Sequence, residues 1–192
     1  MRKRAEQVDQ TRQRIIEAAV HLHGTVGPAE TTIAGIAREA GLTRLTIYRH
    51  FPDDDAIFAA CSAHWLAGQV PPDPARWLVA TDPLTRLRVG LADLYRFYRA
   101  GEAMLTRIYR DKASMPLTRQ QAINQRDAEF CARLLEPFDV TSVSRRRLRA
   151  VVAHAVSFWT WRSLCIEHGL TNREAVDAMV ILAREFAHDR RG

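Results

Sequence analysis

The sequence predicts an all-α fold on three observations. Apolar residues recur at three- and four-residue steps in several long segments, as on the buried face of a helix. No segment alternates convincingly between apolar and polar residues, as a half-buried strand would. Capping residues and prolines mark where the helical segments begin and end. We expect about nine helices, arranged as an N-terminal three-helix head and a larger C-terminal helical domain.

The first helix is expected over residues 10–25, after a charged and polar start. Ile15, Ala18 and Ala19 share its inner face. Two interpretations stay open for Arg2-Lys3-Arg4, which precede it. They can form a basic arm that reaches phosphates or the minor groove of DNA, or a tail that only improves solubility.

Residues 31–51 predict two short helices around a tight turn. Thr31 or Thr32 can cap the first helix, and Gly41 can end it because glycine takes a left-handed backbone without strain. Thr43 can cap the second helix. Two helices joined by a Gly-containing turn form the helix-turn-helix layout, whose second helix can lie in the major groove of DNA.

A fourth helix is expected from a cap at Asp53 to about residue 67. The segment QVPPDP at residues 69–74 follows it, and its prolines argue against a helix there. We therefore expect a DNA-binding domain over residues 1–68 and a second domain over residues 69–192. The second domain is expected to contain helices over residues 83–100, 102–110, 117–136, 144–168 and 171–188.

The helix-turn-helix segment resembles the DNA-binding signature of TetR-type transcriptional regulators over roughly residues 11–60. The matching residues are Ala18-Ala19, Gly27, Thr31-Thr32, Ile36-Ala37, Ala40-Gly41, the run Thr46-Ile47-Tyr48-Arg49-His50-Phe51, Ala56 and Phe58. Three positions depart from the pattern: His23 replaces a core aromatic, Leu45 a small residue or proline, and Asp54 a lysine that often contacts phosphate. The resemblance implies a dimeric regulator that binds double-stranded operator DNA and a small-molecule effector.

The second helix of the motif carries side chains suited to a DNA groove. Arg44 can donate two hydrogen bonds to guanine, and Leu45 can contact a thymine methyl group. Tyr48 and His50 would position the helix on phosphates, as in the family. The alternative is an ordinary solvated helix. The predicted DNA-binding residues are Thr32, Thr43, Arg44, Leu45, Thr46, Tyr48 and His50.

A homodimer is expected through the last two helices. The helix over residues 144–168 is apolar nearly all round, so it must be buried on several sides. Its small-residue face would let a second copy approach closely, and the resemblance implies the same interface. The predicted interface residues are Ala150, Ala153, Ser157, Leu164, Met179, Leu182 and Phe186.

An effector cavity in the second domain is expected mainly from the resemblance. Apolar walls with a few polar groups are how small-molecule sites are built. Each candidate suits ordinary core packing as well, so both interpretations stay open. The candidates are Trp65, Tyr95, Tyr98, Met104, Tyr109, His154, Phe158 and Trp161.

Composition limits the remaining alternatives. The net charge of +6 and the pI near 9.8 suit a polyanionic partner. Three widely spaced cysteines fit a reducing cytoplasm, and there is no signal-peptide pattern or membrane-spanning run. No metal-ligand spacing, phosphate loop or nucleophile–base motif is present, so we expect no metal, no cofactor and no enzymatic activity.

Asp53-Asp54-Asp55 is better explained by helix capping than by a metal site. The four arginines at 145–147 and 149 suit a solvated face or a dimer rim better than a second nucleic-acid site.

These observations together predict a transcriptional regulator, most simply a repressor released from a palindromic operator by an effector. A regulator of the same fold without an effector is the alternative, and an all-α enzyme is the remote one.

Overall fold

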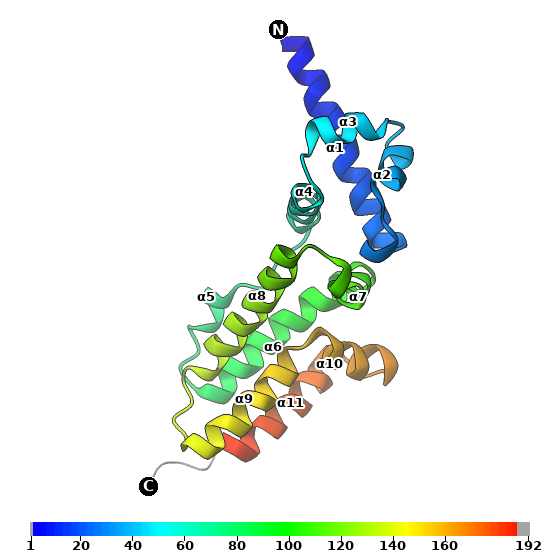
Figure 1. Ribbon diagram of the computed structural model, residues 1–192. Helices are drawn as coiled ribbons and strands as arrows, with labels where there is room; N and C mark the ends of the chain where they lie inside the picture. Colours follow the sequence, from blue (N-terminus) through cyan, green and yellow to red (C-terminus); the bar gives the residue numbers. More distant parts are fainter. Residues whose placement is uncertain (1, 188–192) are drawn as a thin grey trace. The chain divides into compact units, whose positions relative to one another are not determined.

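The computed structural model describes residues 2–187, with side chains from residue 5 onward, and within that range it contains eleven α-helices and no strand (Figure 1). The all-α prediction is confirmed, although the helices exceed the expected nine. The chain packs as two compact units: residues up to 70 with 101–122, and residues 71–100 with those from 123 onward. The division expected at residues 68 and 69 stays a prediction, and in packing terms residues 101–122 lie with the first unit.

The first unit is a small helical bundle. Its elements are α1 (Arg2–Thr25), η1 (Pro28–Glu30), α2 (Ile33–Glu39), α3 (Arg44–His50), α4 (Asp54–Ala67), α7 (Glu102–Arg110), η2 (Lys112–Ser114) and the start of α8 (Leu117–Leu135). α1 packs against α2, α4 and α7. Its buried residues Ile15 and Ala19 join Ile47, Phe51 and Ile57 in one apolar core, which holds the two helices of the motif against α1.

α1 begins well before the predicted start at residue 10. Residues 5–7 are Ala, Glu and Gln, all good helix formers, and neither Pro nor Gly interrupts the segment. Polarity alone therefore did not end the helix. The side chains of Arg2, Lys3 and Arg4 lie outside the described part of the chain, so both interpretations of this basic arm stay open.

The second unit is organised around α6. Its elements are α5 (Pro74–Trp77), α6 (Pro83–Ala100), the rest of α8, α9 (Ser142–Val156), α10 (Phe158–Arg162), the π-helical turn η3 (Ser163–Glu167) and α11 (Asn172–Ala187). α11 packs against both α6 and α9. Leu87, Leu91 and Leu94 of α6 follow one another at four- and three-residue steps and are fully buried, as on the inner face of a helix.

The prediction of one long helix over residues 144–168 is wrong, because the helix is interrupted at Ser157. Its backbone is extended there (φ −63°, ψ 133°), and its hydroxyl accepts a hydrogen bond from the Trp159 N–H at 3.3 Å. Serine competes for backbone donors in this way and so starts a new helix. Ser144, where this helix was expected to begin, does not cap it: α9 begins at Ser142, and the Thr141 hydroxyl accepts from the Ser144 N–H at 3.3 Å. This break and the single turn of α5 account for the additional helices.

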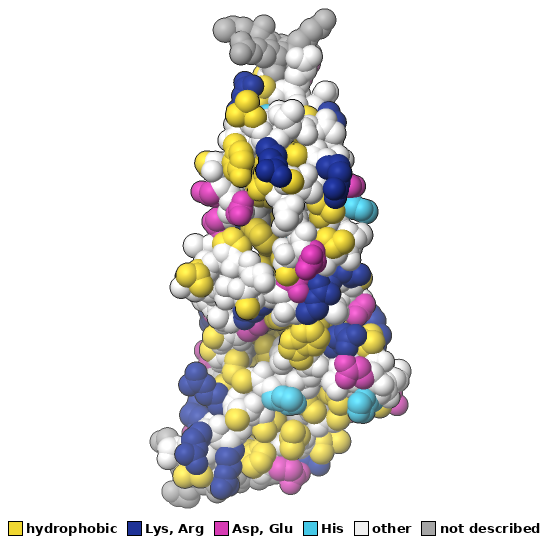
Figure 2. All heavy atoms as spheres, turned by 45° about the vertical axis from the view of Figure 1, so that its right-hand side comes forward, with side chains coloured by type: hydrophobic (Ala, Val, Ile, Leu, Met, Phe, Trp, Pro, Cys, Tyr) yellow, Lys and Arg dark blue, Asp and Glu magenta, His cyan; other side chains and the backbone are white. Residues whose placement is uncertain are grey.

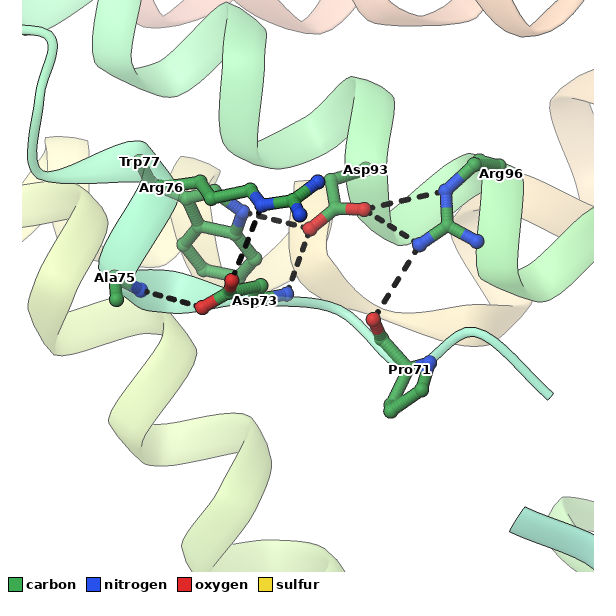
Figure 3. A network of polar contacts seen from close by, with 7 residues as sticks. All are labelled: Pro71, Asp73, Ala75, Arg76, Trp77, Asp93 and Arg96. Carbon is green, nitrogen blue, oxygen red and sulfur yellow. Dashed lines mark hydrogen bonds and ion pairs between the residues drawn. The ribbon is translucent and has the colours of Figure 1, made fainter. Parts of the chain in front are cut away.

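The proline-rich segment is fixed to α6 by one carboxylate (Figure 3). Asp93 accepts hydrogen bonds from the Asp73 N–H at 2.8 Å and from Trp77 Nε1 at 2.9 Å, and Arg96 donates to it at 2.6 Å. Burial acts to raise the pKa of Asp93, but these hydrogen bonds outweigh it and hold the pKa below its usual value. Pro74 starts α5, where a first-turn proline loses no hydrogen bond. The segment is therefore a bound connector.

Candidate nucleic-acid interface

The turn between α2 and α3 is set by three short-range signals. The Thr32 hydroxyl caps α2 by accepting from the Gly35 N–H at 3.0 Å, and the Thr43 hydroxyl caps α3 by accepting from the Thr46 N–H at 3.2 Å. Gly41 lies between them with φ +63°, in the left-handed region. The predicted caps and stop are confirmed, so local signals determine where the two helices begin and end and where the chain turns between them.

α3 has one buried and one exposed side. Ile47 is 0% exposed, and both Ile47 and Phe51, the residue that caps the end of α3, belong to the core. On the other side Arg44 is exposed, Leu45 is 72% exposed and Tyr48 is 51% exposed. The exposed side of α3 therefore combines a cationic, an aliphatic and an aromatic side chain.

The other predicted contact residues have more mixed surroundings. Thr43 and Thr46 share a hydrogen bond between their hydroxyls at 2.9 Å; Thr43 is exposed and Thr46 is half-buried. His50 is also half-buried, whereas Thr32 is exposed at the start of α2. Arg49 is exposed on α3 and was not among the predicted contacts. The DNA-contact roles of all these residues stay predictions.

Two arginines of α1 hold the C-terminal ends of the motif helices. Arg12 Nη1 donates to the His50 carbonyl at 3.0 Å, and its guanidinium lies 4.1 Å from the centre of the Phe51 ring. Arg14 Nη2 donates to the Ala40 carbonyl at 2.5 Å. The sequence carried no signal for these contacts, because each joins a side chain to a backbone oxygen 38 or 26 residues away.

His23 is a buried residue of the first unit. Its ring stacks on Phe58 with centroids 4.5 Å apart, and its Nδ1 lies 3.4 Å from the Cys61 sulfur. Burial lowers the pKa of His23 to about 4 and raises the pKa of the Cys61 thiol to about 11. The histidine therefore fills the place of a core aromatic as a neutral ring.

A polar clamp closes the C-terminal end of α1. Arg107 Nε donates to the Thr25 carbonyl at 2.8 Å, and Arg110 Nη2 donates to the Val26 carbonyl at 2.9 Å. Asp111, whose side chain is buried, accepts from Arg110 and from the Ala29 N–H. Hydrogen bonds from Arg110 hold the pKa of Asp111 below its usual value. Carbonyls that a helix end leaves unpaired are thus satisfied by α7.

The acidic run at the start of α4 serves the fold. The Asp53 carboxylate accepts from the Ala56 N–H at 2.8 Å, which confirms the predicted cap. Asp55 accepts from Arg119 Nε at 3.0 Å and also from the Thr118 hydroxyl. Within residues 2–187 no three His, Cys, Asp or Glu side chains gather as a metal site, and no helix is long and apolar enough to cross a bilayer.

The predicted effector residues fall in both units. Trp65, Met104 and Tyr109 lie in the first unit, and Tyr95, Tyr98, His154, Phe158 and Trp161 lie in the second. Within the second unit the Tyr98 ring packs edge-on against Phe158 at 5.4 Å and lies 5.9 Å from the Trp161 ring. His154 is exposed. The Tyr95 ring stacks on Tyr98 with centroids 6.3 Å apart, so the structure brings four of the candidate aromatic rings together and leaves the histidine outside.

Two buried tyrosine hydroxyls donate hydrogen bonds to backbone carbonyls just before the helix interruption at Ser157. Tyr95 donates to the Ala155 carbonyl at 2.9 Å and Tyr98 donates to the Val156 carbonyl at 2.7 Å. A helix that stops at this point leaves such carbonyls without an N–H partner. Both hydroxyls therefore have a structural function, and burial raises the pKa of Tyr95 well above its usual value.

The predicted dimer residues are exposed to very different degrees. Ala150, Ala153 and Leu182 are exposed, Ser157, Leu164 and Phe186 are half-buried, and Met179 is buried in its own unit. The break at Ser157 prevents the small-residue face from running on to Leu164. Ile181, which is 52% exposed on α11, and Trp159, which is exposed on α10, were not among the predicted interface residues. Figure 2 shows hydrophobic side chains gathered over the lower part of the view, where α9, α10 and α11 lie.

The arginine run at the start of α9 is solvated. Arg145 donates to the Phe138 carbonyl at 2.5 Å. Arg146, Arg147 and Arg149 are exposed and form no ion pair with another described residue. This arrangement agrees with a solvated face, while a place at a dimer rim stays a prediction.

The helix-turn-helix segment is similar to known regulators. A family model described as bacterial regulatory proteins of the tetR family matches residues 15–61. The HTH-type transcriptional regulator SrpR of Pseudomonas putida is 46% identical over 50 residues, which cover 26% of this chain and 24% of that protein. The chain thus aligns with about a quarter of that relative's length.

Solved structures extend the likeness to the whole fold. A TetR-like transcriptional regulator from Rhodococcus sp. RHA1 has a TM-score of 0.61 and 23% identity, and the match covers 93% of this chain and 97% of that one. NalD of Pseudomonas aeruginosa, described as the secondary repressor of the MexAB-OprM multidrug efflux pump, has a TM-score of 0.56 and 18% identity over 94% of this chain and 97% of its own.

Proposed function

The chain belongs, through its N-terminal domain, to the TetR family of bacterial regulatory proteins, and from this premise we propose that it is a DNA-binding transcriptional regulator. The observation that carries the proposal is the exposed side of α3. Arg44, Leu45 and Tyr48 stand in solvent on a short helix whose other side is fixed in a core. In this role Arg44 reads a guanine, while Tyr48 and His50 position the helix on phosphates.

We further propose that the regulator acts as a homodimer in the cytoplasm. The exposed apolar residues of α9, α10 and α11 support this, because a monomer gains nothing from leaving Trp159, Ile181 and Leu182 in water. Two copies related by a two-fold axis would present two α3 helices to successive major grooves, about 34 Å apart. The operator would then be approximately palindromic.

Repression relieved by a small-molecule effector is the simplest form of this proposal. The effector would favour one of two arrangements of the dimer by its differential affinity for them. A regulator without an effector is the second candidate, and one observation favours it. Tyr95, Tyr98, Phe158 and Trp161 are buried, and both tyrosine hydroxyls are already bonded to the backbone.

Selection of bound duplexes from a random DNA pool tests the function directly. We expect an enriched consensus with two-fold symmetry and half-sites one helical turn apart. The affinity for this duplex should exceed that for a scrambled duplex at the same salt concentration, because phosphate contacts alone give no preference. If no sequence is enriched at moderate salt, the proposal is wrong. Adding candidate effectors to the selected complex then distinguishes its two forms.

A further inference from the structure

The two helices of the motif depend on groups outside themselves. α2 and α3 have seven residues each. Helices this short are unstable alone, and the last four carbonyls of each lack a partner within the helix. Thr32 and Thr43 satisfy the N-terminal ends, as described above. At the C-terminal ends, N–H groups of the following residues pair with some carbonyls, and α1 reaches the carbonyls of Ala40 and His50.

Arg12 makes two contacts at the end of α3. Its Nη1 donates to the His50 carbonyl, and its guanidinium carbon lies over the Phe51 ring. A cation at a helix C-terminus is favourable to the helix dipole, and one over an aromatic face is attracted to the ring. Because Phe51 is anchored in the core, the guanidinium connects the end of α3 to a fixed point.

Arg14 makes the equivalent contact at the end of α2. It donates to the Ala40 carbonyl, next to the turn residue Gly41. A Cβ on Gly41 would lie 3.2 Å from Arg14 Nη2, so the turn passes directly beside the guanidinium. The two arginines are two residues apart on α1 and hold the two ends that border the turn and the recognition surface.

We infer that Arg12 and Arg14 form an α1 brace, a pair of positioning residues that fixes the direction in which α3 presents Arg44 and Tyr48. Neither arginine needs to touch DNA for this role, because each acts through a backbone carbonyl of the motif. The inference rests on the proposed function, in which α3 reads the operator. Small displacements of such a helix degrade base contacts, which need close geometry, more than phosphate contacts.

The test compares Arg12→Met with Arg133→Met. Both variants lose one positive charge, but Arg133 is exposed on α8 and makes no hydrogen bond or ion pair with another described residue. The probes are the duplex selected by the wild type and a scrambled duplex of equal length. For Arg12→Met we expect affinity for the selected duplex to fall about tenfold, with little change for the scrambled duplex. The slope of log affinity against log salt should stay the same as in the wild type. Arg12→Lys, which keeps one donor and the charge, should recover part of the loss.

Two results overturn the inference. A salt slope reduced by about one in Arg12→Met identifies Arg12 as a direct phosphate contact. An affinity equal to that of Arg133→Met means that the contacts do not position α3. If Arg12→Met does not fold, Arg14→Met is measured in the same way.

A second readout separates this inference from the proposed function. Amide hydrogen exchange in residues 47–51 needs no DNA, and it should be faster in Arg12→Met than in Arg133→Met if the brace holds α3. If the wild type selects no duplex, the proposed function fails while the exchange measurement still decides whether the brace exists. Equal exchange in both variants shows that it does not.

Discussion

His23 is tolerated in the core only as a neutral ring. Its pKa falls from an ordinary 6.5 to about 4 because burial disfavours the imidazolium. As the pH falls below 6.5, His23 is protonated in the unfolded chain but stays neutral in the folded one. The free energy of unfolding therefore decreases until the pH reaches about 4, where the folded chain also binds the proton. We expect the free energy of unfolding to be about 2 kcal/mol lower at pH 5 than at pH 7.5 from this residue alone.

Denaturant unfolding at the two pH values measures this effect, and His23→Phe is the matched control. Phenylalanine keeps an aromatic ring against Phe58 and cannot be protonated. The variant should lose the acid-sensitive part of its stability. An equal loss in both proteins would place the sensitivity elsewhere.

Arg44 is the residue at which specificity should be concentrated. It is exposed in the first turn of α3, and a bidentate contact from arginine to guanine discriminates among bases. Replacing it with alanine should weaken specific binding by about 1–3 kcal/mol and relax one operator position. Binding measurements on duplexes varied at each position test this, and a uniform loss across all sequences would instead identify a phosphate contact.

The clamp between α1 and α7 depends on the backbone of Gly27. Its φ is +98° and ψ is 164°, a region almost restricted to glycine, and an added Cβ would lie 2.3 Å from a carboxylate oxygen of Asp111. Gly27→Ala should therefore lower the free energy of unfolding by about 3 kcal/mol, from backbone strain together with the disrupted clamp.

Gly169→Ala is the control for this prediction. That residue also has a positive φ of +73°, but an added Cβ would meet nothing within 4 Å. Its cost should be only the left-handed penalty, about 1 kcal/mol. Chemical denaturation of both variants decides, and equal losses would mean that the clamp contributes little.

The break between α9 and α10 is secured by buried hydroxyls. Tyr98→Phe removes the donor to the Val156 carbonyl and leaves a buried acceptor unsatisfied, which should cost about 1–2 kcal/mol in unfolding free energy. Tyr48→Phe removes an exposed hydroxyl and should leave stability unchanged. Thermal unfolding of the two variants gives the comparison, and an unchanged stability of Tyr98→Phe would mean that this hydrogen bond contributes little to folding.

Helix ends were predictable wherever one residue decides them. Asp53, Thr43 and Gly41 act within a few residues of their own position, and the structure places them as predicted. Ser157 was misjudged because its hydroxyl can be solvated in a continuous helix or can cap a new one. The choice between them rests on Tyr95 and Tyr98, which lie far away in the sequence.

The candidate DNA surface was also predictable, because it depends on residues close together in the sequence. The contacts from α1 that hold α3 in place were not predictable. The alternation of Ile47 and Phe51 with Arg44 and Tyr48 is a local pattern that a helix converts into two sides. The contacts of Arg12 with the end of α3 arise only after the chain has folded back on itself. Local patterns therefore locate a recognition helix, and long-range contacts determine how firmly it is held.

At the scale of the whole molecule, self-association should depend on the apolar face of α11. Ile181→Glu places a charge in the middle of the proposed interface, where burying it unpaired is costly. We expect the variant to sediment as a monomer at micromolar concentration and to lose most of its operator affinity, since one subunit reaches only one half-site. Val79→Glu, at another exposed apolar residue, should remain dimeric. A dimeric Ile181→Glu variant would locate the interface elsewhere.

Cys61 lies buried on α4 beside His23 of α1, so the reactivity of its sulfur depends on whether these two helices stay packed together. An alkylating reagent can reach it only while these helices are parted, and its high pKa keeps the thiolate scarce until then. The rate at which Cys61 is alkylated, followed by mass spectrometry, therefore measures how often the packing between α1 and α4 opens. Operator DNA that binds only the folded form would lower this alkylation rate, and the decrease would grow with the strength of binding.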